Sequence, residues 1–214
     1  MLPAAMAANI TGLHPFNNKP LKTMLNRQLE DKKVAILATN GFEESELRSP
    51  MKALVNEGAT VHIISLKEEP IRGWHKGNWA MEPVHVDHTV YTANPAEYAG
   101  LVLPGGVMNP DTLRGDDKAV DFVRGFFELG KPVAAICHAP WTLINAEVVE
   151  GRKMTSYHTV RKDLENAGAQ WVDEPVVVDQ GLVTSRNPGD LEAFNSKVVE
   201  EIAEGIHQAQ KQSV

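Results

Sequence analysis

Short apolar runs alternate with amphipathic segments over most of this chain, and this alternation constrains its fold more than any other feature. Each run has the length of one buried strand, and the segments between them space their apolar residues every three or four positions, as helices do. The expected strands are 33–38, 60–66, 101–103, 131–136, 154–157, 176–178 and 182–185, and the expected helices are 47–58, 117–129, 141–149, 160–167 and a last one from Leu191. Strands that are apolar on both faces are typical of an α/β fold with a mostly parallel sheet covered on both sides.

Two segments depart from this alternation. Residues 72–92 are rich in Gly, Trp and His and are expected to form a hairpin-like excursion, with Val84, Val86, His88 and Val90 on one face. The turn Asp179-Gln180-Gly181 predicts that the two strands beside it, 176–178 and 182–185, form a hairpin.

Length and composition indicate one domain with a short N-terminal arm. A chain of 214 residues with 43% hydrophobic content suffices for one well-packed core. Residues 1–31 have no sustained periodicity and are expected to be a flexible arm or a tag, with 21–29 as a short docking helix. The α/β domain is expected over residues 32–208.

Charge and cysteine content exclude several classes of function. The formal net charge is −7 without a long basic run, which argues against a nucleic-acid partner and favours small molecules or proteins. No apolar run is long enough for a membrane span, so we expect a cytoplasmic protein without a membrane partner. The single cysteine excludes an internal disulfide and zinc sites built on paired cysteines.

No cofactor or metal is expected. The phosphate-binding glycine patterns are missing from the sequence. His75, His85 and His88 suggest a metal site, but on a strand His85 and His88 point to opposite faces, and no carboxylate pair completes the set.

The single cysteine, Cys137, lies where a buried strand gives way to a helix. The small apolar residues 133–136 are followed by Cys137-His-Ala-Pro-Trp141, so the thiol is expected on a tight strand-to-helix turn. Helix amides behind the sulfur favour its anionic form, which predicts a thiol pKa below the ordinary value. The alternative is an inert cysteine buried in the core.

Two further segments point to the same site. Leu103-Pro-Gly-Gly106 ends another strand, and the amide of Gly106, the glycine after Gly105, could form an oxyanion site with that of His138; the alternative is an ordinary turn. Glu43, Glu44 and Glu46 open a helix, where acidic residues commonly complement the helix dipole. The functional alternative is a buried carboxylic acid that stays protonated and donates a hydrogen bond to the sulfur.

With these motifs in order, the chain resembles the PfpI-type family of intracellular peptidases and general stress proteins. The motifs are Phe42-Glu-Glu-Ser-Glu-Leu, Leu101-Val-Leu-Pro-Gly-Gly, Lys131-Pro-Val-Ala-Ala-Ile-Cys-His-Ala-Pro, Gly151-Arg-Lys-Met-Thr-Ser-Tyr, Asn166-Ala-Gly-Ala and Thr184-Ser-Arg. This family belongs to the ThiJ/PfpI superfamily, together with the parkinsonism-associated deglycase and class I glutamine amidotransferase domains. The resemblance implies a flavodoxin-like three-layer sandwich, class I glutamine amidotransferase-like, that assembles as a homodimer or a larger homo-oligomer.

The resemblance also implies roles for individual residues. Cys137 takes the place of the family's nucleophile, and Glu46 takes the place of the carboxyl group beside the thiol. The amides of Gly106 and His138 take the place of the oxyanion site. His138 matches the histidine that the PfpI-type peptidases place beside their nucleophile. In those enzymes an acidic residue of a neighbouring subunit orients this histidine. Asp111 lies near that acidic position, although 107–110 is one residue longer than in the archaeal peptidases and the acid is Asp instead of Glu.

Two more residues are candidates through the resemblance. His158 lies where the deglycase has its histidine near the cysteine, so it competes with His138 as the proton carrier. Tyr157 is expected either to orient substrate through its hydroxyl group or to serve packing alone.

These assignments predict a stress-associated cysteine hydrolase or lyase. Its expected substrates are small reactive carbonyl compounds or glycated proteins and peptides, as for a deglycase or glyoxalase. One alternative is an intracellular peptidase with a Cys-His dyad. The other is a non-enzymatic redox sensor or chaperone, whose thiol would be oxidised to a sulfinic acid.

Overall fold

A computed structural model describes residues 27–213. The expected flexible arm or tag, and most of the helix expected over 21–29, lie outside these residues. The first described residues contact the body of the protein: the Leu29 side chain is fully buried, and its N–H donates a 3.0 Å hydrogen bond to the carbonyl of Glu57.

The centre of the fold is a seven-stranded sheet with the order β10-β11-β7-β6-β1-β2-β5, in which only the pairing of β10 with β11 is antiparallel. Its strands are β1 Lys33–Leu37, β2 Thr60–Ser65, β5 His88–Thr89, β6 Gly100–Leu103, β7 Val133–Ile136, β10 Val176–Asp179 and β11 Leu182–Ser185. Two small sheets lie outside it: β3 Trp74–His75 with β4 Asn78–Trp79, and β8 Lys153–Met154 with β9 Gln170–Trp171. The expected mostly parallel α/β sheet and its terminal hairpin are confirmed.

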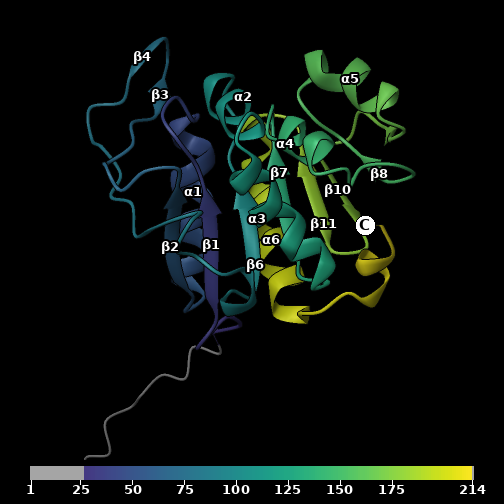
Figure 1. The fold of residues 1–214 in the computed structure, drawn as a ribbon, viewed down its shortest axis with the longest axis horizontal. Helices are drawn as coiled ribbons and strands as arrows, with labels where there is room; N and C mark the ends of the chain where they lie inside the picture. Colours follow the sequence, from purple (N-terminus) through teal and green to yellow (C-terminus); the bar gives the residue numbers. More distant parts are fainter. Residues whose placement is uncertain (1–26, 214) are drawn as a thin grey trace, which may run out of the picture.

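Helices cover both faces of the sheet and complete a three-layer sandwich (Figure 1). The α-helices are α1 Glu44–Asn56, α2 Met108–Arg114, α3 Asp117–Glu128, α4 Pro140–Asn145, α5 Arg161–Asn166 and α6 Leu191–Glu204. Short 3₁₀ helices are η1 Pro95–Glu97, η2 His158–Val160, η3 Pro188–Asp190 and η4 Gln208–Ser213. Alternate residues of β1 enter different cores: Ala35 and Leu37 pack with the α3 side, and Val34 and Ile36 with the α1 and α6 side.

Local sequence signals explain where these helices begin and end. The Asp116 side chain accepts a 3.0 Å hydrogen bond from the Ala119 N–H and caps the N-terminus of α3. Gly130, with φ of 68°, follows the C-terminus of α3 in the left-handed conformation that glycine adopts without strain. The helix predicted over 117–129 is therefore confirmed nearly to the residue.

Three local predictions are wrong. The helix expected over 141–149 ends at Asn145, and the chain soon turns at Glu147, whose φ is 58°. Of the strand expected over 154–157, only Met154 pairs, in the small sheet with β9. The expected hairpin over 72–92 is present as β3 with β4, but His88 does not share the buried face of Val84, Val86 and Val90: it is exposed in β5, which joins the main sheet beside β2.

Candidate active site

Three adjacent parallel strands, β7, β6 and β1, end at the same edge of the sheet. The loop after β7 carries Cys137, the loop after β6 carries Gly105 and Gly106, and α1, which follows β1, carries Glu46 in its first turn. Carboxyl ends of strands are where open α/β sheets place ligand sites. The parallel topology therefore brings together residues that lie far apart in the sequence.

Cys137 occupies the strand-to-helix turn in a strained backbone conformation. Its φ is 65°, which a residue with a side chain adopts only when its surroundings impose it. Two backbone hydrogen bonds hold it there: its N–H donates to the Ser185 carbonyl at 3.0 Å, and its carbonyl accepts from the Tyr157 N–H at 2.9 Å. The strands and loops on either side thus fix the direction of the thiol.

Gly105 and Gly106 are glycines because the backbone passes too close to its neighbours for a side chain. A Cβ on Gly105 would lie 2.6 Å from the Cys137 Cβ and equally close to the Glu46 Oε2. A Cβ on Gly106, whose φ is 79°, would lie 2.5 Å from the carbonyl oxygen of Gly41. The amides of Gly106 and His138 both act on the Cys137 sulfur and lower its pKa, so they lie close to the place that an oxyanion site beside this thiol would occupy.

The Glu46 side chain is fully buried beside the sulfur. Its Oε2 accepts a 2.9 Å hydrogen bond from the Gly105 N–H, and its Oε1 is buried without a hydrogen-bond partner among the described residues. Burial raises the pKa of Glu46 from 4.5 to about 8, opposed by the Gly105 hydrogen bond and assisted by the charge of Glu43. The carboxyl group is therefore mostly protonated at pH 7.

The prediction of a lowered thiol pKa is wrong. Cys137 is only 6% exposed, and burial raises its pKa well above the ordinary value. The charge of Glu46, when ionised, acts in the same direction, and the hydrogen bonds from Gly106 and His138 oppose both. The expected helix effect is small because α4 has only six residues and begins with Pro140, which has no N–H to offer the sulfur.

His138 is the histidine that reaches the thiol. Its Nδ1 lies 3.1 Å from the Cys137 Sγ, and its Nε2 lies 3.3 Å from the hydroxyl of Thr159. The imidazole stacks on Tyr157 with centroids 4.8 Å apart and meets the edge of Trp141 at 5.1 Å. Burial, and then the charge of the nearby His158, lower the pKa of His138, so the ring is neutral at pH 7 and able to accept a proton.

The other residues predicted for the site lie around this centre. His158 is exposed, and its ring packs on Tyr157 at 4.4 Å. Asp111 is an exposed residue of α2 whose carboxylate binds Arg114 at 2.7 Å, so within one chain it does not orient the His138 ring. Glu43 immediately precedes α1, is half-buried and accepts a hydrogen bond from the Ser45 hydroxyl at 3.1 Å.

Sequence reasoning missed Thr159. Its hydroxyl is the described partner of the second imidazole nitrogen, where the resemblance suggested an acid from another subunit. No pattern marked it, because Thr159 is an exposed residue of a 3₁₀ helix and meets His138 only in the folded chain.

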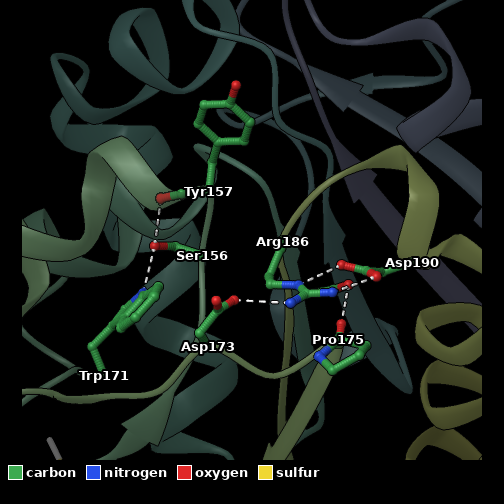
Figure 2. A network of polar contacts seen from close by, with 8 residues as sticks. Ser156, Tyr157, Trp171, Asp173, Pro175, Arg186 and Asp190 are labelled. Carbon is green, nitrogen blue, oxygen red and sulfur yellow. Dashed lines mark hydrogen bonds and ion pairs between the residues drawn. The ribbon is translucent and has the colours of Figure 1, made fainter.

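A polar network supports the loop that carries Tyr157 (Figure 2). The Ser156 hydroxyl donates to the Tyr157 carbonyl and accepts from the Trp171 indole, both at 3.0 Å. Nearby, Arg186 follows β11 and binds Asp173 at 2.8 Å and both carboxylate oxygens of Asp190 at 2.9 and 3.0 Å. These contacts anchor the loops after β8 and β11, and the Tyr157 ring points away from them (Figure 2).

Of the three histidines considered for a metal site, His75 lies 3.4 Å from the carboxylate of Glu44, and none belongs to a group of three or more ligating side chains in the described part of the chain. The only metal-compatible cluster of three or more side chains within residues 27–213 is Glu201, Glu204 and His207, distant in the sequence from the thiol. None of the helices in this part of the chain has the length and apolar character needed to cross a membrane.

Comparison with known proteins agrees with this geometry. Residues 32–201 match the model of the DJ-1/PfpI family. The chain belongs to the DJ-1/PfpI family. Among solved structures, this DJ-1/PfpI fold is similar to Drosophila melanogaster DJ-1beta, with a TM-score of 0.73 and 27% identity over 85% of this chain and 94% of that one. It is also similar to a two-domain Anabaena variabilis protein with DJ-1/ThiJ/PfpI-like and ferritin-like domains, with a TM-score of 0.76 and 36% identity over 83% and 49% of the two chains.

Curated DJ-1/PfpI relatives carry two kinds of functional name. Deglycase PfpI of Pyrococcus furiosus is 46% identical over 78% of this chain and 97% of its own, and protein/nucleic acid deglycase 2 of Escherichia coli is 44% identical over 78% and 96%. The putative cysteine protease YraA of Bacillus subtilis is 42% identical over 77% of this chain and 94% of its own. Both kinds of name are those of enzymes, which supports an enzymatic function for this chain. They differ in the reaction, so the reaction depends on the geometry of the site.

Proposed function

We propose that this protein is a cysteine-dependent deglycase that removes dicarbonyl adducts, such as those of methylglyoxal, from the side chains of proteins. The observation that carries the proposal is the pairing of the Cys137 thiol with the neutral His138 imidazole, 3.1 Å away, beside a buried and protonated Glu46. The deglycase names of relatives more than 40% identical support the same substrate class.

The thiol adds to the carbonyl carbon of the adduct in the first step. A carbon–sulfur bond forms, the thiol proton passes to the His138 Nδ1, and the carbonyl oxygen becomes an oxyanion held by the amides of Gly106 and His138. Because burial keeps the thiol protonated at rest, this proton transfer accompanies the attack. The imidazole must therefore present its lone pair at Nδ1 and its proton at Nε2, toward the Thr159 hydroxyl.

The net reaction needs no external oxidant or reductant. A methylglyoxal hemiaminal and one water yield the free amine and lactate, because one carbon of the adduct is oxidised to a carboxylate while its neighbour is reduced to an alcohol. Protonated Glu46 and the imidazolium of His138 are the two groups that return protons to the departing amine and to the new alcohol.

The direct test uses preformed adducts of methylglyoxal on N-acetylarginine, N-acetyllysine and N-acetylcysteine, freed of excess methylglyoxal. We expect lactate and regenerated side chain to appear together, with chelator present, and Cys137→Ala to abolish both. His138→Ala is expected to lose at least about a hundredfold in rate, and the exposed His158→Ala less than about tenfold. Lactate formation that persists in Cys137→Ala would refute the proposal.

The peptidase is the second candidate, because a Cys-His dyad also suits peptide hydrolysis and one relative is named a putative cysteine protease. Cys137-dependent cleavage of casein or short peptides, without lactate formation from the adducts, would favour it. Glycated nucleic acid belongs in the same test because the name of the E. coli relative includes it, although the net charge of −7 argues against a nucleic-acid partner. The redox-sensor alternative is disfavoured by the raised thiol pKa, since the thiolate is the form that peroxides oxidise.

A further inference from the structure

A cluster of ligating side chains lies at the C-terminus of α6, outside the proposed active site. Glu201 and Glu204 belong to the last turn of this helix, and His207 follows the left-handed turn at Gly205, whose φ is 94°. One ligand atom from each of the three side chains lies within 4.8 Å of the other two. The chain reverses at Gly205, which brings the His207 imidazole close to the carboxylates of Glu201 and Glu204.

Two atoms of the cluster lie close together without a hydrogen bond between them. The Nε2 of His207 lies 3.2 Å from the Oε2 of Glu201, yet this buried nitrogen has no hydrogen-bond partner among the described residues. Two donor atoms bound to one metal at about 2.0 Å in a tetrahedral arrangement are about 3.3 Å apart and face the metal instead of each other. The observed separation and the missing hydrogen bond both fit that arrangement.

The Glu201 side chain is 8% exposed, and its described ionic partner is His207. One further buried group near the imidazole lacks the partner that a buried polar group needs. Gln210 is fully buried; its Nε2 donates to the Lys131 carbonyl, which fixes the amide orientation and leaves its Oε1 without a partner. A Cβ added to Gly181 would lie 2.9 Å from that oxygen and 2.8 Å from the His207 Cδ2, so both side chains approach the same glycine.

Electrostatics at this end of α6 also favours a cation. Glu201 and Glu204 repel each other, and the C-terminus of a 14-residue helix adds partial negative charge. Burial raises the pKa of Glu201, and the positive charge that opposes this most is that of His207 itself. Lys197 acts on Glu201 more weakly; it is half-buried and has its ammonium group 2.7 Å from Glu200.

We propose that Glu201, Glu204 and His207 bind one divalent transition-metal ion, with the Gln210 side-chain oxygen at the border of the site. One imidazole nitrogen and two carboxylates are a donor set that suits zinc and its neighbours better than magnesium or calcium, which prefer oxygen ligands alone.

The position of the site indicates a structural role. His207 donates from its N–H to the Gly130 carbonyl at 2.8 Å, just before β7 begins, whereas Cys137 follows the end of β7. The site thus lies at the edge of the sheet opposite the thiol, near the yellow C-terminal segment at the bottom of Figure 1. A bound ion would fasten the segment after Gly205 to α6.

The test is calorimetric titration of the tag-free, EDTA-treated full chain with Zn²⁺, in a Cys137→Ala background so that the thiol cannot bind the metal. We expect one saturable site per chain and a higher melting temperature with Zn²⁺ than with Mg²⁺. Because losing even an outer-shell partner of a metal ligand weakens affinity 10- to 100-fold, His207→Ala and Glu204→Gln should raise the dissociation constant at least about tenfold.

Glu200→Gln is the matched control, since it removes the same charge from the same helix at a residue that pairs with Lys197. It is expected to bind Zn²⁺ like the parent chain. Glu204 is exposed, so Glu204→Gln should fold normally even if substitution at His207 disturbs the segment. No saturable binding in the parent, or equal binding by Glu204→Gln and Glu200→Gln, would overturn the proposal.

Discussion

Replacing Glu46 with Gln should change how the stability of this protein depends on pH. The substitution keeps the size of the side chain and the oxygen that accepts from the Gly105 N–H, and it removes the titrating proton. In the folded chain the pKa of Glu46 is raised from 4.5 to about 8, mainly by burial. A raised pKa means that the folded state holds a proton which the unfolded state releases between these two values.

The sign and the size of the effect follow from this difference. The stabilisation due to the raised pKa is complete below pH 4.5 and is lost as the pH rises toward about 8. A difference of about 3.5 pKa units corresponds to roughly 5 kcal/mol in total, of which about 3.5 kcal/mol falls between pH 5 and pH 8. Wild type should therefore lose about that much unfolding free energy relative to Glu46→Gln over this interval.

Urea unfolding of both proteins at pH 5, 6, 7 and 8 measures this difference. The lowered pKa of His138 affects both proteins alike, so its contribution cancels when the two curves are subtracted. Glu68→Gln removes an exposed carboxylate and should leave the pH dependence of wild type unchanged. Parallel curves for wild type and Glu46→Gln from pH 5 to pH 8 would refute the argument that burial keeps Glu46 protonated.

Three further substitutions test the packing and the geometry of the site. Gly105→Ala places a Cβ 2.6 Å from that of Cys137, so we expect loss of turnover and a destabilisation of about 1–3 kcal/mol in urea unfolding. Thr159→Val removes the hydroxyl beside the His138 Nε2, which should lower kcat about tenfold in the lactate assay, equivalent to a hydrogen bond of about 1.4 kcal/mol. Phe127→Ala empties a fully buried position of the α3 core and should cost about 3–5 kcal/mol of unfolding free energy without altering the pH profile of turnover.

Two of these predictions have a control variant within the chain, and each has a result that would contradict it. Gly115→Ala adds a Cβ whose nearest neighbour is 3.6 Å away and should leave turnover unchanged; a similar loss in both alanine variants would contradict the steric argument. Thr159→Ser keeps the hydroxyl and should restore kcat, and equal kcat in Thr159→Val and wild type would exclude a role in orienting His138. A destabilisation below about 1 kcal/mol for Phe127→Ala would show that the α3 core is not tightly packed.

Local patterns in the sequence determined the fold class and the position of the cysteine. Apolar runs of strand length, helical spacing and glycine turns depend on neighbours a few residues away, so they can be read without a structure. The parallel sheet, α3 and the C-terminal hairpin followed from such patterns. The corner at Cys137 did too, because a small apolar strand that runs directly into His-Ala-Pro has to turn there.

Tertiary structure alone decided the protonation of the site and the partners of its residues. The raised pKa values of Cys137 and Glu46 come from burial among segments that are far apart in the sequence, and no local pattern reports that burial. The contact of Thr159 with His138 joins residues 21 positions apart, and that of Glu46 with Gly105 joins residues 59 positions apart. The sequence thus determined where the thiol lies, whereas the packing of distant loops around it decided which charge it carries and which groups exchange protons with it.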